Sequence, residues 1–191
     1  MATPVIRTRR WNRVEYERLV DLGVFKPGER LELLDGVLVV REPQNAPHAT
    51  ALGATQEALR AAFGPSFHVR PQLPIALDDE SEPEPDIAVV RGSYRDYRSA
   101  HPASAVLIVE VADSTLMTDR RKGGLYARAK VPEYWIVNLI DETLEVYRRP
   151  RPSRSSRFGW SYTDALVLRR SDVLSPLAGP AARVTVADLL P

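Results

Sequence analysis

The twenty residues LIVEVADSTLMTDRRKGGLY, 107–126, decide the fold of this chain. They begin as a strand whose apolar run is interrupted by one carboxylate, Glu110, and they continue into a helix. By the alternation of a strand, Glu110 shares a face with Ile108 and Ala112. Continuous apolar runs are typical of strands covered on both faces. We therefore expect a buried carboxylate that requires a proton, a cation or an ion-pair partner.

A lysine occupies the apolar face of the helix that follows. Lys122, Leu125, Tyr126 and Ala129 stand at i, i+3, i+4 and i+7, which is one side of a helix. Because the apolar side of such a helix packs on the sheet, we expect the ammonium group to point toward the strand of Glu110.

A second carboxylate precedes another apolar strand, in PDIAVV, 85–90. Asp86 shares a face with Ala88 and Val90, although aspartate is depleted in strands. Two carboxylates on neighbouring strands form a natural site for Mg²⁺, which takes a few carboxylates and keeps waters. With a nearby ammonium group, the set suits metal-assisted hydrolysis of a phosphodiester. A buried structural network of charges is the alternative that these residues leave open.

The remaining pattern predicts one mixed α/β sheet with helices packed on it. Two prolines, Pro71 and Pro74, favour an edge position or a bulge for the strand that contains them. Val14, Leu19 and Leu22 are expected to form the apolar side of the first helix. We expect helices over 12–22, 48–63 and from Thr118 or Asp119 to about Lys130, a hairpin over 30–40, strands over 67–77, 85–91, 105–112, 133–139 and 143–149, and a late strand or two after 160.

Length and composition restrict the possible classes of protein. The chain has 191 residues, which suits one domain over 1–191, with a core over about 28–150 and accessory strands over 151–191. A net charge of +1 provides no global basic field, and the absence of cysteine excludes disulfides, thiol nucleophiles and cysteine zinc sites. The sequence has no signal-peptide pattern and no apolar run of membrane-spanning length, so we expect a cytoplasmic protein without a membrane span.

Several segments together resemble the Uma-type family of restriction-endonuclease-like proteins, within the PD-(D/E)xK nuclease superfamily. The matching segments cover roughly residues 14–150 and are LELLDGVLV, the helix opened by His48, PEPDIAVV, LIVEVADST, DRRK with the downstream Tyr126, and VPEYWIVN. In the usual superfamily signature the lysine follows the glutamate by two positions, where this chain has Ala112. The resemblance places the lysine on the next helix instead, at Lys122.

The resemblance implies a fold and a set of site residues. The fold is a restriction-endonuclease-like mixed central sheet, α/β (α+β), flanked by helices and preceded by a helix and a hairpin. Asp86 and Glu110 would hold Mg²⁺ or Mn²⁺, Lys122 would be the catalytic lysine, Glu32 an additional acid and His48 an accessory residue. The residues alone leave alternatives open: Glu32 as a solvated charge on a strand, and His48 as a surface or helix-cap residue.

The implied activity is metal-dependent endonuclease cleavage, with DNA as the substrate and a homodimer as the expected assembly. Arg91, Arg95 and Arg154 lie in segments that can contact phosphates, or that are only mobile surface loops. The alternative function is a catalytically inactive nuclease fold that serves as a nucleic-acid-binding or assembly scaffold.

Overall fold

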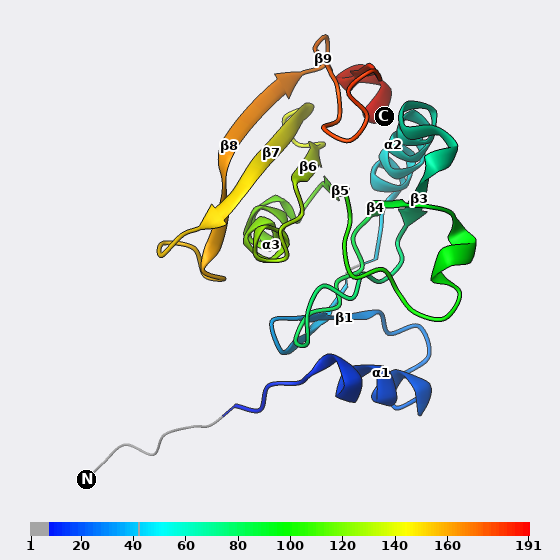
Figure 1. The fold of residues 1–191 in the computed structure, drawn as a ribbon, viewed down its shortest axis with the longest axis vertical. Coiled ribbons are helices and arrows are strands. Elements are labelled where there is room, and N and C mark those ends of the chain that lie inside the picture. Colours follow the sequence, from blue (N-terminus) through cyan, green and yellow to red (C-terminus); the bar gives the residue numbers. More distant parts are fainter. Residues whose placement is uncertain (1–7, 42) are drawn as a thin grey trace.

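A six-stranded mixed sheet forms the centre of the fold, with the strand order β3-β4-β5-β6-β7-β8 (Figure 1). The computed structural model describes residues 8–41 and 43–191. Its helices are α1 (Arg13–Asp21), α2 (Ala46–Phe63) and α3 (Leu116–Arg128), with short 3-10 turns at Gly64–Ser66, Tyr94–Tyr97 and Val186–Leu189. Its strands are β1 (Leu31–Leu34), β2 (Val37–Val40), β3 (Phe67–Pro71), β4 (Ile87–Arg91), β5 (Leu107–Ala112), β6 (Glu133–Asn138), β7 (Thr143–Pro152), β8 (Trp160–Arg169), β9 (Val173–Leu174) and β10 (Val184–Thr185). The predicted mixed α/β class is confirmed.

Only β5 and β6 pair in parallel within the central sheet of the described residues. Parallel neighbours require a crossover connection, and α3 provides it. The strand–helix–strand reading of residues 107–138 is therefore confirmed. Strand β3, which contains Pro71, lies at the edge of the sheet, as the proline predicted.

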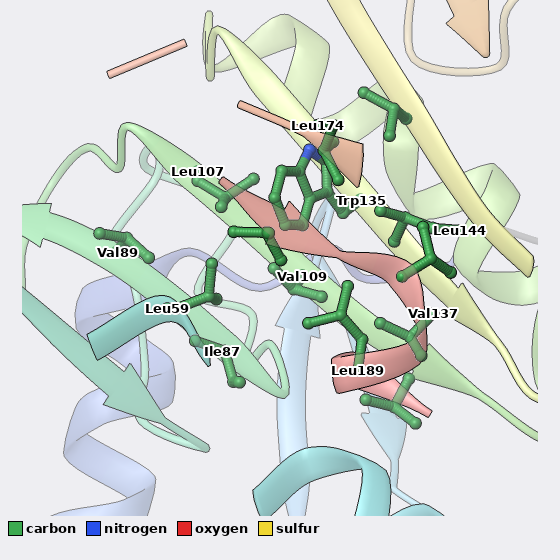
Figure 2. Close-up of a cluster of buried hydrophobic side chains, with 14 of the residues drawn as sticks. Leu59, Ile87, Val89, Leu107, Val109, Trp135, Val137, Leu144, Leu174 and Leu189 are labelled. Carbon is green, nitrogen blue, oxygen red and sulfur yellow. The ribbon is translucent and has the colours of Figure 1, made fainter. Parts of the chain in front are cut away.

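The two faces of β5 build two different cores. Leu107, Val109 and Val111 pack with α2 and with Trp135 of β6 in one cluster (Figure 2). Ile108 and Ala112 belong to a second cluster on the opposite face, which also contains Tyr126 of α3. Because Glu110 alternates with the second set, its carboxylate lies on the α3 side of the sheet.

The β1–β2 hairpin packs against the acidic segment that precedes β4. Asp35 and Gly36 have φ angles of 49° and 75°, as a tight two-residue hairpin turn requires. The backbone of Leu33 pairs with Glu82, whose N–H donates to the Leu33 carbonyl at 2.8 Å. Glu32 and Leu33 are consequently both buried, at 3% and 0% exposure, and the alternative of a solvated strand charge at Glu32 is wrong.

Two of the helices start earlier than the sequence predicted. The N–H groups of Thr118 and Asp119 donate to the carbonyl of Thr115, so α3 is capped at Thr115. Helix α2 is capped by the side chain of Asn45, which places His48 inside its first turn. A Pro at the second helical position needs no intrahelical donor, which explains this start.

The first helix has the predicted bounds but not the predicted apolar side. Val14 and Leu22 are 68% and 66% exposed. The buried contact is made by Tyr16, whose hydroxyl donates to the carbonyl of Leu31 at 2.8 Å. A nine-residue helix that lies beside a hairpin needs only one such anchor.

Strand β8 extends the central sheet beyond β7, and β9 and β10 form a separate two-stranded sheet. The description of residues 1–191 as one domain with C-terminal accessory strands stays a prediction. In the part of the chain that the structure describes, no helix has both the length and the apolar character needed to cross a membrane.

Candidate active site

The five predicted catalytic and accessory residues line one cavity of about 280 Å³. They come from different elements: Glu32 from β1, His48 from α2, Asp86 from the start of β4, Glu110 from β5 and Lys122 from α3. The antiparallel register pairs Ile87 with Val109, so Asp86 and Glu110 stand opposite each other.

Asp86 is held by backbone and side-chain donors at the start of β4. Its Oδ2 accepts a hydrogen bond from the N–H of Val111 at 2.9 Å, and its own N–H donates to Glu110 Oε2 at 3.1 Å. Burial disfavours its charged form, but the hydrogen bond and charge of His48, with help from Val111 and Arg41, hold the pKa of Asp86 below its ordinary value. Asp86 is therefore a carboxylate at neutral pH.

Glu110 is as enclosed as Glu32, at 3% exposure. Its Oε1 accepts hydrogen bonds from the Tyr126 hydroxyl at 2.7 Å and from Lys122 Nζ at 3.2 Å. Burial raises the pKa of Glu110, the charge of Lys122 lowers it, and the nearby charges of Asp86 and Glu32 raise it further. The net direction is upward, so Glu110 binds a proton more readily than a solvated glutamate.

Lys122 bridges two carboxylates. Its Nζ lies 2.8 Å from Glu32 Oε1 and 3.2 Å from Glu110 Oε1. Burial lowers the pKa of Lys122, but the charges of Glu110 and Glu32 outweigh burial and raise it above the ordinary value. Glu32 is oriented by the N–H of Glu84, which donates to its Oε2 at 3.1 Å. This shift favours the protonated amine, and the ammonium group donates hydrogen bonds to both carboxylates.

His48 contacts the first carboxylate directly. Its Nε2 lies 3.2 Å from Asp86 Oδ1. Burial lowers the pKa of His48, but the hydrogen bond and charge of Asp86 raise it, and the net direction is upward. His48 is therefore part of the cavity and not only a helix-cap residue, which was the alternative that the sequence left open.

Three cavity or contact residues were missed by the sequence reasoning. Arg41 follows the hairpin and lies 3.5 Å from Asp86 Oδ1 while it pairs with Glu84 at 2.8 Å. Asp119 is 5% exposed, and burial together with the charge of Glu110 raises its pKa to about 7. Gln72 lies 3.4 Å from Asp86 Oδ1. Asp119 could have been found, because it stands three residues before Lys122 on the same helix face; Arg41 and Gln72 carry no local signal.

The three arginines predicted to touch nucleic acid lie outside this cavity. Arg91 ends β4 and lies over the ring of Phe67, Arg95 lies in the turn Tyr94–Tyr97, and Arg154 lies between β7 and β8. All three are exposed. In Figure 1 the turn Tyr94–Tyr97 and the β7–β8 connection lie on opposite sides of the molecule. Their contact with a nucleic acid stays a prediction.

The donor set fits a hard divalent cation. Asp86 Oδ1 has three nitrogen neighbours, at 3.2, 3.4 and 3.5 Å, and none is at the 2.7–2.9 Å of a strong charge-assisted hydrogen bond. Such long hydrogen bonds are weak, so they compete less with a bound cation than short ones would. Among the described residues no group of three or more His, Cys, Asp or Glu side chains is close enough to enclose a metal ion. A pair of carboxylates is compatible with Mg²⁺ or Mn²⁺, since Mg²⁺ commonly keeps several waters.

Comparison with known proteins gives one family and a similar fold. The profile of the Uma2 family, described as "Putative restriction endonuclease", matches residues 13–185. A crystal structure described as "a putative nuclease belonging to DUF820", from Anabaena variabilis, is 12% identical, with a TM-score of 0.67 over 94% of this chain and 97% of that one, which shows similarity of fold. The type IIG restriction endonuclease BpuSI is 16% identical over 64% of this chain and 14% of that chain, and its TM-score of 0.40 supports no conclusion. No protein with a curated function matches the chain.

Proposed function

The chain belongs to the Uma2 family, and from that premise we propose that it is a metal-dependent endonuclease that hydrolyses phosphodiester bonds in DNA. One observation carries the proposal: the carboxylates of Asp86 and Glu110 and the ammonium group of Lys122 face the same cavity from two strands and a helix. Paired carboxylates beside a cationic donor are the groups that metal-assisted hydrolysis needs.

Asp86 and Glu110 would hold Mg²⁺ or Mn²⁺ in this proposal. A divalent cation, when bound, supplies Lewis-acid polarisation of the phosphoryl oxygen. The donors of Asp86 fix its direction from both sides, since the Val111 N–H holds Oδ2 and His48 holds Oδ1. His48 is therefore proposed as a positioning residue for Asp86.

Lys122 would act on the attacking water and on the phosphate through hydrogen bonds and charge. As an ammonium group beside Glu32 and Glu110, it is a hydrogen-bond donor and a positive charge, and not a base. It can orient the water that attacks phosphorus, and it can stabilise the negative charge that gathers on the phosphate oxygens. Glu32, 2.8 Å away, holds the ammonium group in place.

The direct test is a cleavage assay on single-stranded, duplex and branched DNA and on RNA, with Mg²⁺, Mn²⁺ or EDTA. We expect cleavage with a divalent cation and a loss of at least about a hundredfold in Asp86→Asn and in Lys122→Met, as is usual when a charge-stabilising group is removed. Glu82→Gln is the matched control, because Glu82 is a buried acid that does not line the cavity. Cleavage that survives both Asp86→Asn and Lys122→Met would refute the mechanism.

The alternative, a non-catalytic scaffold, differs in its metal binding. In that case Lys122 serves only to neutralise Glu32 and Glu110. Calorimetric titration of Mg²⁺ and Mn²⁺ separates the two functions: a nuclease binds the ion and its Glu110→Gln variant binds it less tightly, whereas a scaffold binds it in neither form. A homodimer, which would place two such sites on the two strands of a duplex, is proposed with the nuclease and is tested by sedimentation.

A further inference from the structure

A second cavity, of about 290 Å³, lies on the other side of α3. It is formed between α3 and the β7–β8 hairpin, which run beside each other in Figure 1. Helix α3 thus separates two cavities, since Lys122 lines the first and Arg120 and Arg121 line the second.

The pair Gly123-Gly124 lies where helix α3 meets its neighbours at this cavity. Both glycines line it. A Cβ on Gly124 would lie 2.8 Å from Ser156 Oγ and 3.1 Å from the carbonyl oxygen of Trp160, and a Cβ on Gly123 would lie 3.3 Å from the ring of Tyr134. Glycine in a helix interior is costly; here Gly124 allows the β7–β8 hairpin, and Gly123 the ring of Tyr134 on β6, to approach the helix closely.

The second cavity is cationic. It is lined by Arg120, Arg121 and Arg157, and by no aspartate or glutamate. Arg120 is already bound by the carboxylate of Glu145, at 2.6 and 3.0 Å. Within the described residues, Arg121 and Arg157 form no ion pair with any acidic side chain, so two guanidinium groups are available to a ligand.

Tyrosine rings and serine hydroxyls complete the lining. The hydroxyls of Tyr134 and Tyr162 donate to the carbonyls of Asp119 and Val131, at 2.9 Å each, so these side chains offer ring surface rather than polar groups. Ser156 and Ser161 add hydroxyl donors. Guanidinium and hydroxyl donors above apolar ring surface suit a phosphate group attached to a sugar.

The first cavity has the opposite character. It is lined by five acidic residues, namely Glu32, Asp86, Glu110, Asp113 and Asp119. Arg41, His48 and Lys122 also line it and offset part of this negative charge, so without a metal ion an anionic strand is drawn more strongly to the second cavity. This difference in charge suits the first cavity to the bond that is cleaved and the second cavity to holding the strand.

We infer that the cavity between α3 and the β7–β8 hairpin binds a backbone phosphate of the nucleic-acid strand, through Arg121 and Arg157, away from the bond that is cleaved. The inference rests on the proposed nuclease function and adds a binding subsite to it. Arginine forks match phosphate oxygens in geometry and charge, and each such contact releases counterions.

The test is fluorescence anisotropy with labelled oligonucleotides in EDTA, where no cleavage occurs, over a range of salt. We expect the double variant Arg121→Ala/Arg157→Ala to bind a single strand about tenfold more weakly near 0.15 M salt, with a salt slope smaller by roughly 0.7, as the loss of one neutralised phosphate predicts. The matched control is Arg18→Ala/Arg169→Ala, which removes the same charge from exposed positions outside both cavities. The control is expected to bind within about twofold of the wild type.

Three results would overturn the inference, in distinguishable ways. Equal affinity of the double variant and the control would refute the subsite and leave the proposed cleavage function intact. Equal displacement of the oligonucleotide by a mononucleotide or by inorganic phosphate at similar concentrations would assign the cavity to a free phosphate ligand instead of a strand. A wild-type protein without affinity for any oligonucleotide would overturn the subsite together with the nucleic-acid substrate.

Discussion

Replacing Lys122 with methionine tests whether the buried charges of the site depend on one another. Methionine keeps most of the stem volume and removes the ammonium group that lies 2.8 Å from Glu32 and 3.2 Å from Glu110. The two carboxylates are only 3% exposed, so water replaces the lost partner incompletely. Burial already raises the pKa of Glu110, and the loss of Lys122 removes the largest effect that lowers it.

The cost follows from the proton that Glu110 must then hold. Keeping one carboxyl group protonated at pH 7, about 2.7 units above its ordinary pKa of about 4.3, costs roughly 3.7 kcal/mol. This agrees with the ~3–5 kcal/mol that breaking one side of a buried ion pair costs. Because a raised pKa means that the folded state binds more protons than the unfolded state, the stability of the variant falls as the pH rises. The deficit should shrink to roughly 1 kcal/mol at pH 5.

The assay is urea unfolding of wild type and Lys122→Met between pH 5 and pH 8, in EDTA. Lys26→Met is the matched control, because Lys26 is exposed, and its free energy of unfolding should stay within about 0.5 kcal/mol of wild type. Glu110→Gln in the Lys122→Met background should recover part of the loss and remove the part of the pH dependence that comes from Glu110. A deficit that does not change with pH would refute the reasoning, since it would show that lost packing and not charge sets the cost.

Three further predictions concern the helix interface and the first carboxylate. Gly124→Ala should lower the free energy of unfolding by about 1–3 kcal/mol, because its Cβ would meet the carbonyl oxygen of Trp160 at 3.1 Å. Gly53→Ala, whose Cβ would meet nothing within 4 Å, should raise the free energy of unfolding by roughly 0.5–1 kcal/mol. Denaturant unfolding measures both, and equal effects of the two substitutions would contradict the close approach at Gly124. The pKa of His48, followed by NMR in EDTA, should lie above its ordinary value and fall in Asp86→Asn; the stability from this pair is present below pH ~6.5 and is lost as the pH rises through the folded pKa. Mg²⁺ at a hundredfold excess over its Kd should stabilise the wild type by about 2.7 kcal/mol, which is measured as a rise in melting temperature. An equal rise in Asp86→Asn would contradict binding by this carboxylate.

The local pattern of residues 107–126 was sufficient to predict the elements around the site. The strand reading of Glu110, the strand–helix–strand order and the inward face of Lys122 follow from periods of 2 and 3.6, which are properties of the backbone alone. Helix starts were less certain, because the first N–H groups of a helix can be satisfied in several ways. The side chain of Asn45 caps α2, whereas α3 begins at the carbonyl of Thr115 without a side-chain cap.

Tertiary structure decided which charges meet. Glu32 could have faced solvent, and it is buried because the segment around Glu82 pairs with the hairpin and closes its second face. Arg41 approaches Asp86 only because the hairpin ends beside β4, a contact between residues 45 positions apart. Such partners are brought together by tertiary packing, which the periodicity of the sequence does not predict.

The glycine pair shows the same division most clearly. The sequence by itself determined that Gly123-Gly124 would weaken a helix, because glycine has excess freedom in the unfolded chain. Only the tertiary structure gives a reason for glycine at position 124: the β7–β8 hairpin lies so close to α3 that a methyl group there would collide with it. Periodicity determines which way a side chain points along its own element, whereas the space that it finds there is set by elements that arrive from elsewhere in the chain.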